Sequence, residues 1–132
     1  MLLVDTNVLV DVLQNDPQWA EWSIAQLRAQ SSLHALVINP VIYAEISLSF
    51  STLEALDDVL GTLALELREI PRPALFLAAK AYAQYRRRGG AKLQVLPDFF
   101  IGAHAAVEGW PLLTRDASRF RPYFPTLDLL AP

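Results

Sequence analysis

Residues 1–10, MLLVDTNVLV, place an apolar run directly before Asp5 and a helical pattern directly after it. Residues 1–5 predict a short buried strand that ends on this aspartate. The apolar side chains of Val8, Leu9 and Val12 recur at helical spacing, which predicts a helix over residues 7–14. A buried strand that leads at once into a helix is typical of α/β folds, so we expect Asp5 at the edge of a sheet.

The same alternation of strand and helix continues to the end of the chain. Further strands are expected over residues 35–38, 65–70, 112–114 and 126–130. Asp16-Pro17 and Asn39-Pro40 are typical helix starts, because a capping side chain precedes a proline in the first turn. Helices are expected over residues 16–30, 41–50, 51–61, 74–88 and 97–108. Strands separated by helices indicate a parallel sheet that is covered on both faces.

The size and composition of the chain fit one domain. We expect its 132 residues to form a single domain over residues 1–132. The hydrophobic fraction of 53% is high for this size, which favours an oligomer or a tightly held partner over a well-filled core alone. The apolar start lacks a basic flank and is interrupted by acids, so it predicts neither a signal peptide nor a membrane span. The cytoplasm is the expected location.

Composition also limits the chemistry that is available. There is no cysteine and there are only two histidines, so a metal site would need oxygen or imidazole ligands. The net charge of −3 gives no overall basic field for nucleic acid. Arginines nevertheless gather at residues 86–88 and again at 115, 119 and 121. The P-loop and the GxGxxG fingerprint are absent, which argues against nucleotide binding by those routes.

Four carboxylates are expected at one edge of the sheet. Asp5 ends the first strand, Asp116 follows the fourth, and Asp98 lies in the first turn of the last long helix. Glu45, one turn into the helix after the second strand, can point to that edge as well. Ligands of parallel sheets bind beyond the carboxyl ends of the strands, which makes this edge the predicted active site. Taken singly, each acid also fits a helix cap, a helix-dipole partner, a turn residue or a solvated residue.

These acids would repel one another strongly. Two unit charges about 4 Å apart cost roughly 4 kcal/mol at an effective dielectric of about 20. That cost is large beside a domain stability of about 5–15 kcal/mol. Protons or cations must therefore neutralise the acids, and an all-oxygen cluster suits Mg²⁺ or Mn²⁺. Without an ion, we expect the cluster to be loose, protonated, hydrated or occupied by a positive group of a partner.

A cation at this edge has one evident use. It could activate a water molecule and neutralise charge on a phosphodiester during an in-line displacement. Asp5 and Asp98 are the predicted primary metal ligands, and Asp116 would complete the site directly or through water. Glu45 could bind a second metal ion or orient the water.

Four segments in this order resemble a known family. They are LLVDTNVLV at residues 2–10, YAEI at 43–46, PDFFIGAHA at 97–105 and LTRD at 113–116. Together they resemble PIN-domain ribonucleases, and in size and spacing they look most like the VapC-type toxins of prokaryotic toxin–antitoxin pairs. The resemblance covers essentially the whole chain. It implies a three-layer α/β/α sandwich with a mostly parallel sheet of four to five strands, and Mg²⁺- or Mn²⁺-dependent cleavage of RNA.

The resemblance also implies partners and supporting residues. The four acids match the acidic positions of the family, Asn7 matches the small polar residue after the first aspartate, and Thr114 matches the hydroxyl before the last. The implied partners are an RNA substrate, a second copy in a homodimer, and a cognate antitoxin protein, with DNA reached only through the antitoxin. The antitoxin segment would lie on the apolar helices between residues 19 and 61.

Some residues outside the acidic set are further candidates for a functional role. Arg86, Arg87, Arg88 and Arg115 are candidate contacts to an RNA backbone, although a solvated helix end is the commoner reason for the first three. His104 lies well down its helix and on a different face from the acid in its first turn. We therefore interpret it as a packed histidine and not as a metal ligand.

Two other functions compete with a nuclease. A phosphatase that forms an aspartyl-phosphate usually has a second aspartate two residues after the nucleophile, and here Asn7 occupies that position. A PIN-like scaffold, or a regulatory partner in an antitoxin–DNA complex, would not need four acids. The complete acidic set therefore favours catalysis.

Overall fold

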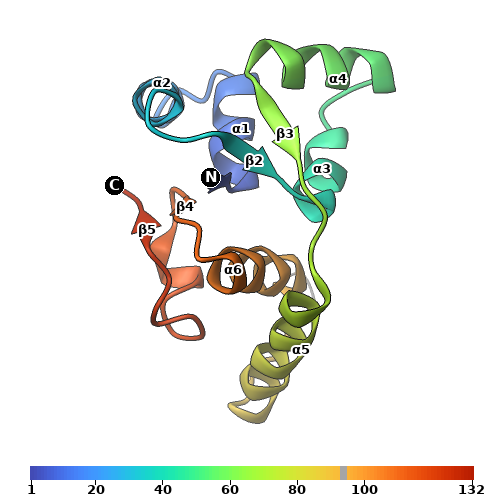
Figure 1. The fold of residues 1–132 in the computed structure, drawn as a ribbon, viewed down its shortest axis with the longest axis vertical. Helices are drawn as coiled ribbons and strands as arrows, with labels where there is room; N and C mark the ends of the chain where they lie inside the picture. Colours follow the sequence, from blue (N-terminus) through green and yellow to red (C-terminus); the bar gives the residue numbers. More distant parts are fainter. Residues whose placement is uncertain (93–94) are drawn as a thin grey trace.

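A single parallel sheet forms the centre of the molecule. The computed structural model describes residues 1–92 and 95–132. The strands are β1 (Leu2–Val4), β2 (Leu36–Ile38), β3 (Leu65–Leu67), β4 (Leu112–Leu113) and β5 (Leu129–Leu130). They lie in the order β3-β2-β1-β4-β5, and each neighbouring pair is parallel. The predicted α/β class is confirmed, with a sheet that is wholly and not just mostly parallel (Figure 1).

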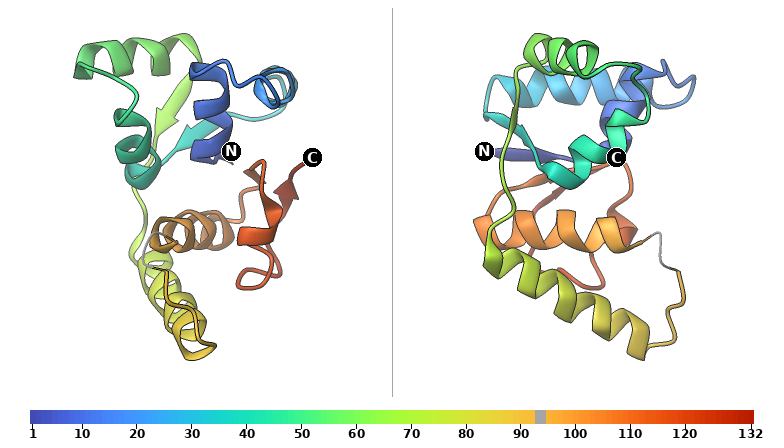
Figure 2. Two further views of the ribbon diagram at one scale, coloured as in Figure 1. Left: turned by 180° about the vertical axis from the view of Figure 1, so that it is seen from behind. Right: turned by 90° about the vertical axis from the view of Figure 1, so that its right-hand side faces the viewer.

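Helices cover both faces of this sheet. The described residues form α1 (Thr6–Leu13), α2 (Ala20–Ser31), α3 (Pro40–Ser47), α4 (Leu53–Thr62), α5 (Arg72–Arg87), α6 (Leu96–Glu108) and the single 3₁₀ turn η1 (Ala117–Arg119). Figure 2 shows α1, α2 and α4 on one side of the sheet and α5 and α6 on the other. The helix α3 contacts both α1 and α6 and so joins the two sides. This arrangement confirms the three-layer α/β/α sandwich.

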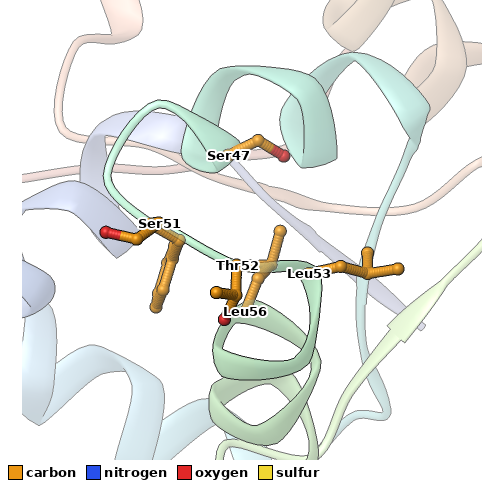
Figure 3. A pocket seen from close by; sticks show the side chains of 6 residues that line it. Ser47, Ser51, Thr52, Leu53 and Leu56 are labelled. Carbon is orange, nitrogen blue, oxygen red and sulfur yellow. The ribbon is translucent and has the colours of Figure 1, made fainter.

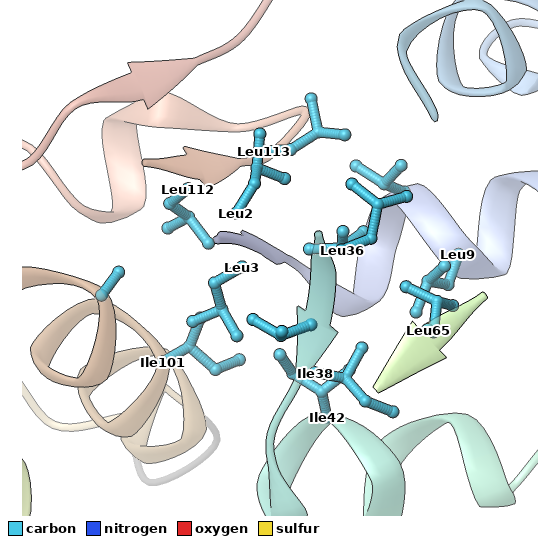
Figure 4. Close-up of a cluster of buried hydrophobic side chains, with 14 of the residues drawn as sticks. Leu2, Leu3, Leu9, Leu36, Ile38, Ile42, Leu65, Ile101, Leu112 and Leu113 are labelled. Atoms are coloured by element: carbon cyan, nitrogen blue, oxygen red, sulfur yellow. The ribbon is translucent and has the colours of Figure 1, made fainter. Parts of the chain in front are cut away.

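The core consists of the strands and the helix faces that cover them. All three side chains of β1 are fully buried, and so are both side chains of β4. Ile42 of α3 and Ile101 of α6 close over them, as Figure 4 shows. Each aliphatic side chain buried in this way contributes about 1.5–3 kcal/mol. The edge strand β3 buries Leu65 but leaves Leu67 51% exposed, so it is less buried than the central strands.

Of the two predicted helix starts, the one at Asn39 is confirmed and the one at Asp16 is displaced. The Asn39 side chain accepts a hydrogen bond from the backbone N–H of Ile42, and the Thr52 side chain caps α4 in the same way. The Asp16 side chain, in contrast, accepts hydrogen bonds from the backbone N–H groups of Gln18 and Trp19, which lie in a turn over residues 17–19. The prediction of a helix from residue 16 was therefore wrong, because this turn intervenes and α2 begins only at Ala20.

Two of the strands are shorter than the sequence predicts. The strand β3 ends at Leu67, three residues earlier than expected, and β5 contains only Leu129 and Leu130 of the predicted 126–130. Their pairing partners β2 and β4 are themselves only three and two residues long, which limits the ladder each can support. Within the described residues, no helix is long and apolar enough to cross a membrane.

A glycine allows the segment after β4 to pack closely on α6. A Cβ atom at Gly102 would lie only 2.5 Å from the ring of Phe124 and 3.1 Å from the ring of Phe120. Phe120 is fully buried and Phe124 is 4% exposed. Close packing at Gly102 therefore anchors the residues around η1 against α6.

Candidate acidic site

Asp5 lies where the first strand becomes a helix. It follows β1, caps α1 and is only 1% exposed. Its Oδ1 accepts a hydrogen bond of 2.8 Å from the backbone N–H of Thr6, and its Oδ2 accepts one of 2.8 Å from the Thr114 hydroxyl. The aspartate therefore has the capping role that its sequence position allows, yet it also faces the end of the neighbouring strand β4.

The supporting residues form a short network between β1 and β4. The Thr114 hydroxyl, fully buried, accepts a hydrogen bond of 3.1 Å from the Asp116 N–H while it donates to Asp5. Asn7 accepts one of 3.2 Å from the N–H of Arg115, and its amide nitrogen lies 3.5 Å from the Thr114 hydroxyl. Asn7 and Thr114 therefore fix the start of the segment that carries Asp116 against the start of α1.

The other two acids reach the same edge from α3 and α6. Asp98 lies in the first turn of α6, as expected, and Glu45 lies in α3. The Oε1 of Glu45 accepts a hydrogen bond of 2.6 Å from the hydroxyl of Thr6, the residue after Asp5. The structure thus brings the four predicted acids to one edge of the sheet, with Glu45 joined to the others through Thr6.

One arginine of this chain lies between three of the acids. The guanidinium of Arg119 places Nη2 3.0 Å from Oδ2 of Asp5, Nη1 3.4 Å from Oδ1 of Asp98 and Nε 3.6 Å from Oδ2 of Asp116. From the sequence, we expected a positive group among these acids only from a partner protein. That limit was wrong, because the cation belongs to the same chain and comes from the 3₁₀ turn directly after Asp116.

Burial makes the charged forms of two of these acids costly. Burial raises the pKa of Asp5, although Arg119 and the hydrogen bonds from Thr114 and Thr6 oppose the rise. Burial also raises the pKa of Asp98 to about 6, and the charges of Asp5, Glu45 and Asp116 add to the rise that Arg119 opposes. The site therefore favours either a proton or a cation, as the expected repulsion among the acids requires.

The donor atoms suit a hard divalent ion, but their present spacing suits a guanidinium. Carboxylate oxygens are the ligands that Mg²⁺ and Mn²⁺ prefer. Among residues 1–92 and 95–132, however, no three acidic or histidine side chains lie close enough together to hold a metal ion as they stand. Arg119 is a stand-in cation in the position where the acids converge. The residues therefore fit a divalent ion in chemistry, provided that the carboxylates can close around it.

Sequence reasoning missed two parts of this region. Arg119 stands out in the sequence only as one of a group of arginines, although its spacing of three residues from Asp116 allows an ion pair across one turn. Asp11 stands out only as an interruption of an apolar run. It is 2% exposed, accepts a hydrogen bond of 3.0 Å from the Ser23 hydroxyl, and lies 3.0 Å from Nε of Arg115.

The remaining candidate residues lie away from the acids. Nε of Arg115 is paired with Asp11 by distance but without an aligned hydrogen bond, and the guanidinium lies 5.5 Å from the centre of the Trp19 ring. Residues 86–88 are exposed at the end of α5. His104 is fully buried beside Asn39, 3.2 Å from its amide nitrogen, which agrees with its interpretation as a packed histidine.

An open hollow also lies between the end of α3 and the start of α4. It has a volume of about 240 Å³ and is lined by Ser47, Phe50, Ser51, Thr52, Leu53 and Leu56 (Figure 3). Leu48 beside it is 91% exposed and Leu53 is 60% exposed. The lining combines three hydroxyl side chains with three apolar ones, and it lies within the region where the sequence predicted a partner.

The fold and the acids at one edge of the sheet define a class of protein. Its members are α/β/α domains with a parallel sheet and a group of carboxylates at the carboxyl ends of strands such as β1 and β4. The model of one family within this class, described as PIN domain, matches residues 2–123. The chain therefore belongs to the PIN domain family, whose members are generally nucleases. A comparison with curated proteins found no match.

Several solved structures share this fold. A chain of VapBC2 from Rickettsia felis bound to a promoter DNA fragment superposes with a TM-score of 0.75 at 18% identity, over 99% of this chain and 98% of that one. A chain of DNA-bound VapBC from Salmonella typhimurium gives 0.71 at 19% identity, over 98% and 96%. VapBC-1 from nontypeable Haemophilus influenzae gives 0.74 at 16% identity, over 98% and 96%. At these identities the likeness establishes the fold.

Proposed function

We propose that this chain is a Mg²⁺- or Mn²⁺-dependent endoribonuclease and the toxin of a VapBC-type toxin–antitoxin pair. The observation that carries the proposal is the convergence of Asp5, Asp98 and Asp116 on one cationic group, with Glu45 joined to them through Thr6. An acid cluster that already contains a cation is suited to bind one. Membership of the PIN domain family supports the nuclease activity.

Each acid has a distinct proposed role. Asp5 and Asp98 would be the primary metal ligands, because both are drawn to the same guanidinium and are the more buried of the three. Asp116 would complete the site, and Glu45 would orient water or a second ion. When bound, the metal supplies charge neutralisation at a phosphodiester and an activated water. Asn7 and Thr114 would keep Asp5 and Asp116 in register through their hydrogen bonds.

The substrate would approach from the side that carries the free arginines. Residues 86–88 are exposed at the end of α5, which packs on the helix that carries Asp98. Their positive charge would attract the backbone of RNA. Arg115 is the weaker candidate, because its guanidinium is already paired with Asp11.

The proposed protein partner is an antitoxin that covers the hollow between α3 and α4. The exposed Leu48 and Leu53 beside this hollow would be buried by an apolar segment of the partner. VapBC structures with the same fold support such an assembly, and those bound to DNA support contact with DNA through the antitoxin. A homodimer in the cytoplasm is part of the proposal, with the exposed Leu75 and Phe76 of α5 as candidate contacts.

The decisive experiment is a cleavage assay on structured RNA with Mg²⁺, with Mn²⁺ and with EDTA. Cleavage should require the metal and should fall at least about a hundredfold in Asp5→Asn and in Asp98→Asn. Asp58→Asn, at an exposed position of α4, is the matched control and should retain full activity. Cleavage that persists in EDTA, or in both site variants, would falsify the mechanism.

The toxin role needs its own test in cells. Expression of the chain alone should arrest growth, and the Asp5→Asn variant should not. Co-expression of the product of a neighbouring gene should relieve the arrest and should yield a complex that copurifies. An arrest that the Asp5→Asn variant also causes would show that cleavage is not its origin.

A further inference from the structure

Arg119 uses each side of its guanidinium for a different carboxylate. Its Nη2 faces Asp5, its Nη1 faces Asp98 and its Nε faces Asp116, at 3.0, 3.4 and 3.6 Å. The three acids come from β1, α6 and the segment after β4, so one side chain joins three separate elements. Such a contact does more than a surface ion pair, because Asp5 is only 1% exposed.

The turn that carries Arg119 is held firmly on both sides. Phe120, the next residue, is fully buried against Gly102 of α6. On the other side, the Ser118 hydroxyl donates a hydrogen bond of 2.6 Å to Oδ1 of Asp116. The backbone of this turn therefore aims Arg119 at the acids, while the side chain itself remains 37% exposed.

We propose that Arg119 is a built-in counter-ion that holds Asp5, Asp98 and Asp116 together and must leave before a divalent ion binds. The inference rests on the proposed metal-dependent function for the identity of the ion. The guanidinium and the ion would compete for the same carboxylate oxygens of Asp5, Asp98 and Asp116. The chain would thus set its own threshold for loading metal.

The distances show why the two cations exclude each other. Mg²⁺ needs its oxygen ligands at about 2.0–2.1 Å and in nearly octahedral geometry. The guanidinium holds three carboxylates around its own larger perimeter at 3.0–3.6 Å. Within the described residues, these acids consequently lie too far apart to hold a metal ion. Loading requires the carboxylates to move inward, into the space that the guanidinium fills.

A place for the displaced side chain lies next to the site. A cleft of about 190 Å³ is lined by Arg119 itself and by Tyr85, Val95, Asp98, Phe99, Ser118 and Tyr123. Its aromatic walls can accept a guanidinium through cation–π contacts. Arg119 can therefore turn away from Asp5 without movement of the buried Phe120.

The test compares Arg119→Gln with the matched variant Arg121→Gln. Both substitutions remove one positive charge from the same segment, and Arg121 is exposed. Titration calorimetry with Mn²⁺ should give a dissociation constant about tenfold lower for Arg119→Gln, within the usual range of coupling between two sites. Arg121→Gln should stay within about twofold of the parent chain, because it changes only the general field.

Stability without metal gives a second and independent readout. In EDTA, Arg119→Gln should lower the melting temperature, because three carboxylates lose their counter-ion, and Mn²⁺ should restore more stability than in the parent chain. Adding Asp5→Asn to Arg119→Gln should recover most of the loss in EDTA. Arg119→Lys keeps the charge but concentrates it at a single point, so its Mn²⁺ affinity and its melting temperature should lie between those of the parent chain and Arg119→Gln. This variant replaces Arg119→Gln in the test if the glutamine variant does not fold.

The outcomes separate this inference from the proposed function. Equal Mn²⁺ affinities in the parent chain, Arg119→Gln and Arg121→Gln would overturn it, and so would an Arg119→Gln chain that binds no Mn²⁺. An unchanged melting temperature of Arg119→Gln in EDTA would overturn it as well. RNA cleavage that is insensitive to EDTA would instead overturn the proposed function, while the EDTA melting series would still decide whether Arg119 is the counter-ion.

Discussion

Two buried aspartates at the two ends of α1 have very different surroundings. Asp5 caps the start of the helix and Asp11 lies in its last turns, and their exposures are 1% and 2%. Each faces an arginine from the segment after β4. Asp11 has Arg115 to itself, whereas Asp5 shares Arg119 with two further acids.

The pair of Asp11 and Arg115 is closed, in the sense that its two charges balance each other. The Ser23 hydroxyl donates to the same carboxylate, and the Trp19 ring lies beside the Arg115 guanidinium. One positive and one negative charge balance there, so the pair needs nothing more. Its effect is to hold α1, α2 and the segment after β4 in fixed positions.

The Asp5 cluster is open. Three carboxylates share one guanidinium, which leaves negative charge uncompensated whenever all of them are ionised. The cluster also borders a cleft that Asp98 and Arg119 line. The same two residue types thus give a structural pair at one end of α1 and the proposed exchangeable cation site at the other. The ratio of acids to arginines decides which of the two results.

The largest expected effect is a difference in stability when the same substitution, aspartate to asparagine, is made at Asp11 and at Asp5. Asp11→Asn should lower the free energy of unfolding by about 2–3 kcal/mol, because it breaks a buried pair and leaves the partner uncompensated. Asp5→Asn should change it by less than about 1 kcal/mol in EDTA, because it also relieves repulsion among the acids. Urea unfolding in EDTA measures both values.

Two further measurements test the reason for that difference. Replacing the pair together, as Asp11→Leu with Arg115→Met, should recover most of the loss, since well-packed apolar residues can replace a buried ion pair. Mn²⁺ should raise the melting temperature of Asp11→Asn but not of Asp5→Asn. Equal losses of stability at the two positions would remove the distinction between a closed pair and an open cluster.

Most of the fold follows from local patterns in the chain. The segment around Asp5 combines a buried strand with a helical repeat, and Asn39 caps a helix as its sequence predicts. The start of α2 does not follow, because Asp16 caps a turn with the same side-chain chemistry that would cap a helix. A local signal identifies the cap but not the kind of turn that comes next.

The acids of the site were predictable, but their partners were not. Asp5 and Asp116 follow strand ends, Asp98 lies in a first helical turn and Glu45 lies one turn into its helix, and parallel-sheet geometry brings such positions to one edge. The contact of Arg119 depends instead on how far Phe120 sinks against Gly102, which is a matter of packing between distant segments. The pairing of Asp11 with Arg115 depends on the same kind of tertiary contact and leaves no pattern in the sequence.

A smaller effect should come from His104, a buried polar group with no charged partner. The Asn39 oxygen already accepts from Ile42, so the Asn39 amide donates to Nδ1 of His104, and the imidazole carries its proton on Nε2. Burial lowers the pKa of His104 below its ordinary 6.5, although Glu108 opposes this. The unfolded chain therefore binds the proton more readily, and stability should fall as the pH drops below about 6.5.

His104→Gln tests this contribution, because glutamine keeps an acceptor but does not titrate. Between pH 7 and pH 5 the variant should lose less stability than the parent chain, because its side chain takes up no proton on unfolding. Acids that titrate in both chains cancel in the difference. Parallel stability–pH curves for the two chains would show that His104 is not a source of acid sensitivity.

The smallest effect should come from the arginines that have no acid beside them. Among the described residues, Arg86, Arg87 and Arg88 form no ion pair, although Arg88 lies 5.7 Å from the ring centre of Tyr123. Changing all three to glutamine should weaken RNA binding at low salt, and the loss should shrink as the salt concentration rises. The slope of log affinity against log salt should fall by about 2, at about 0.7 for each phosphate contact.

Arg115→Gln is the contrasting variant for this measurement, made in an Asp98→Asn background so that RNA is not cleaved. Because its guanidinium is committed to Asp11, its loss should lower stability and leave the salt slope nearly unchanged. If the triple variant binds RNA with the same affinity and slope as its parent, residues 86–88 are only a solvated helix end. A large change in slope for Arg115→Gln would mean that the pair with Asp11 opens when RNA binds, and that it is less closed than its geometry indicates.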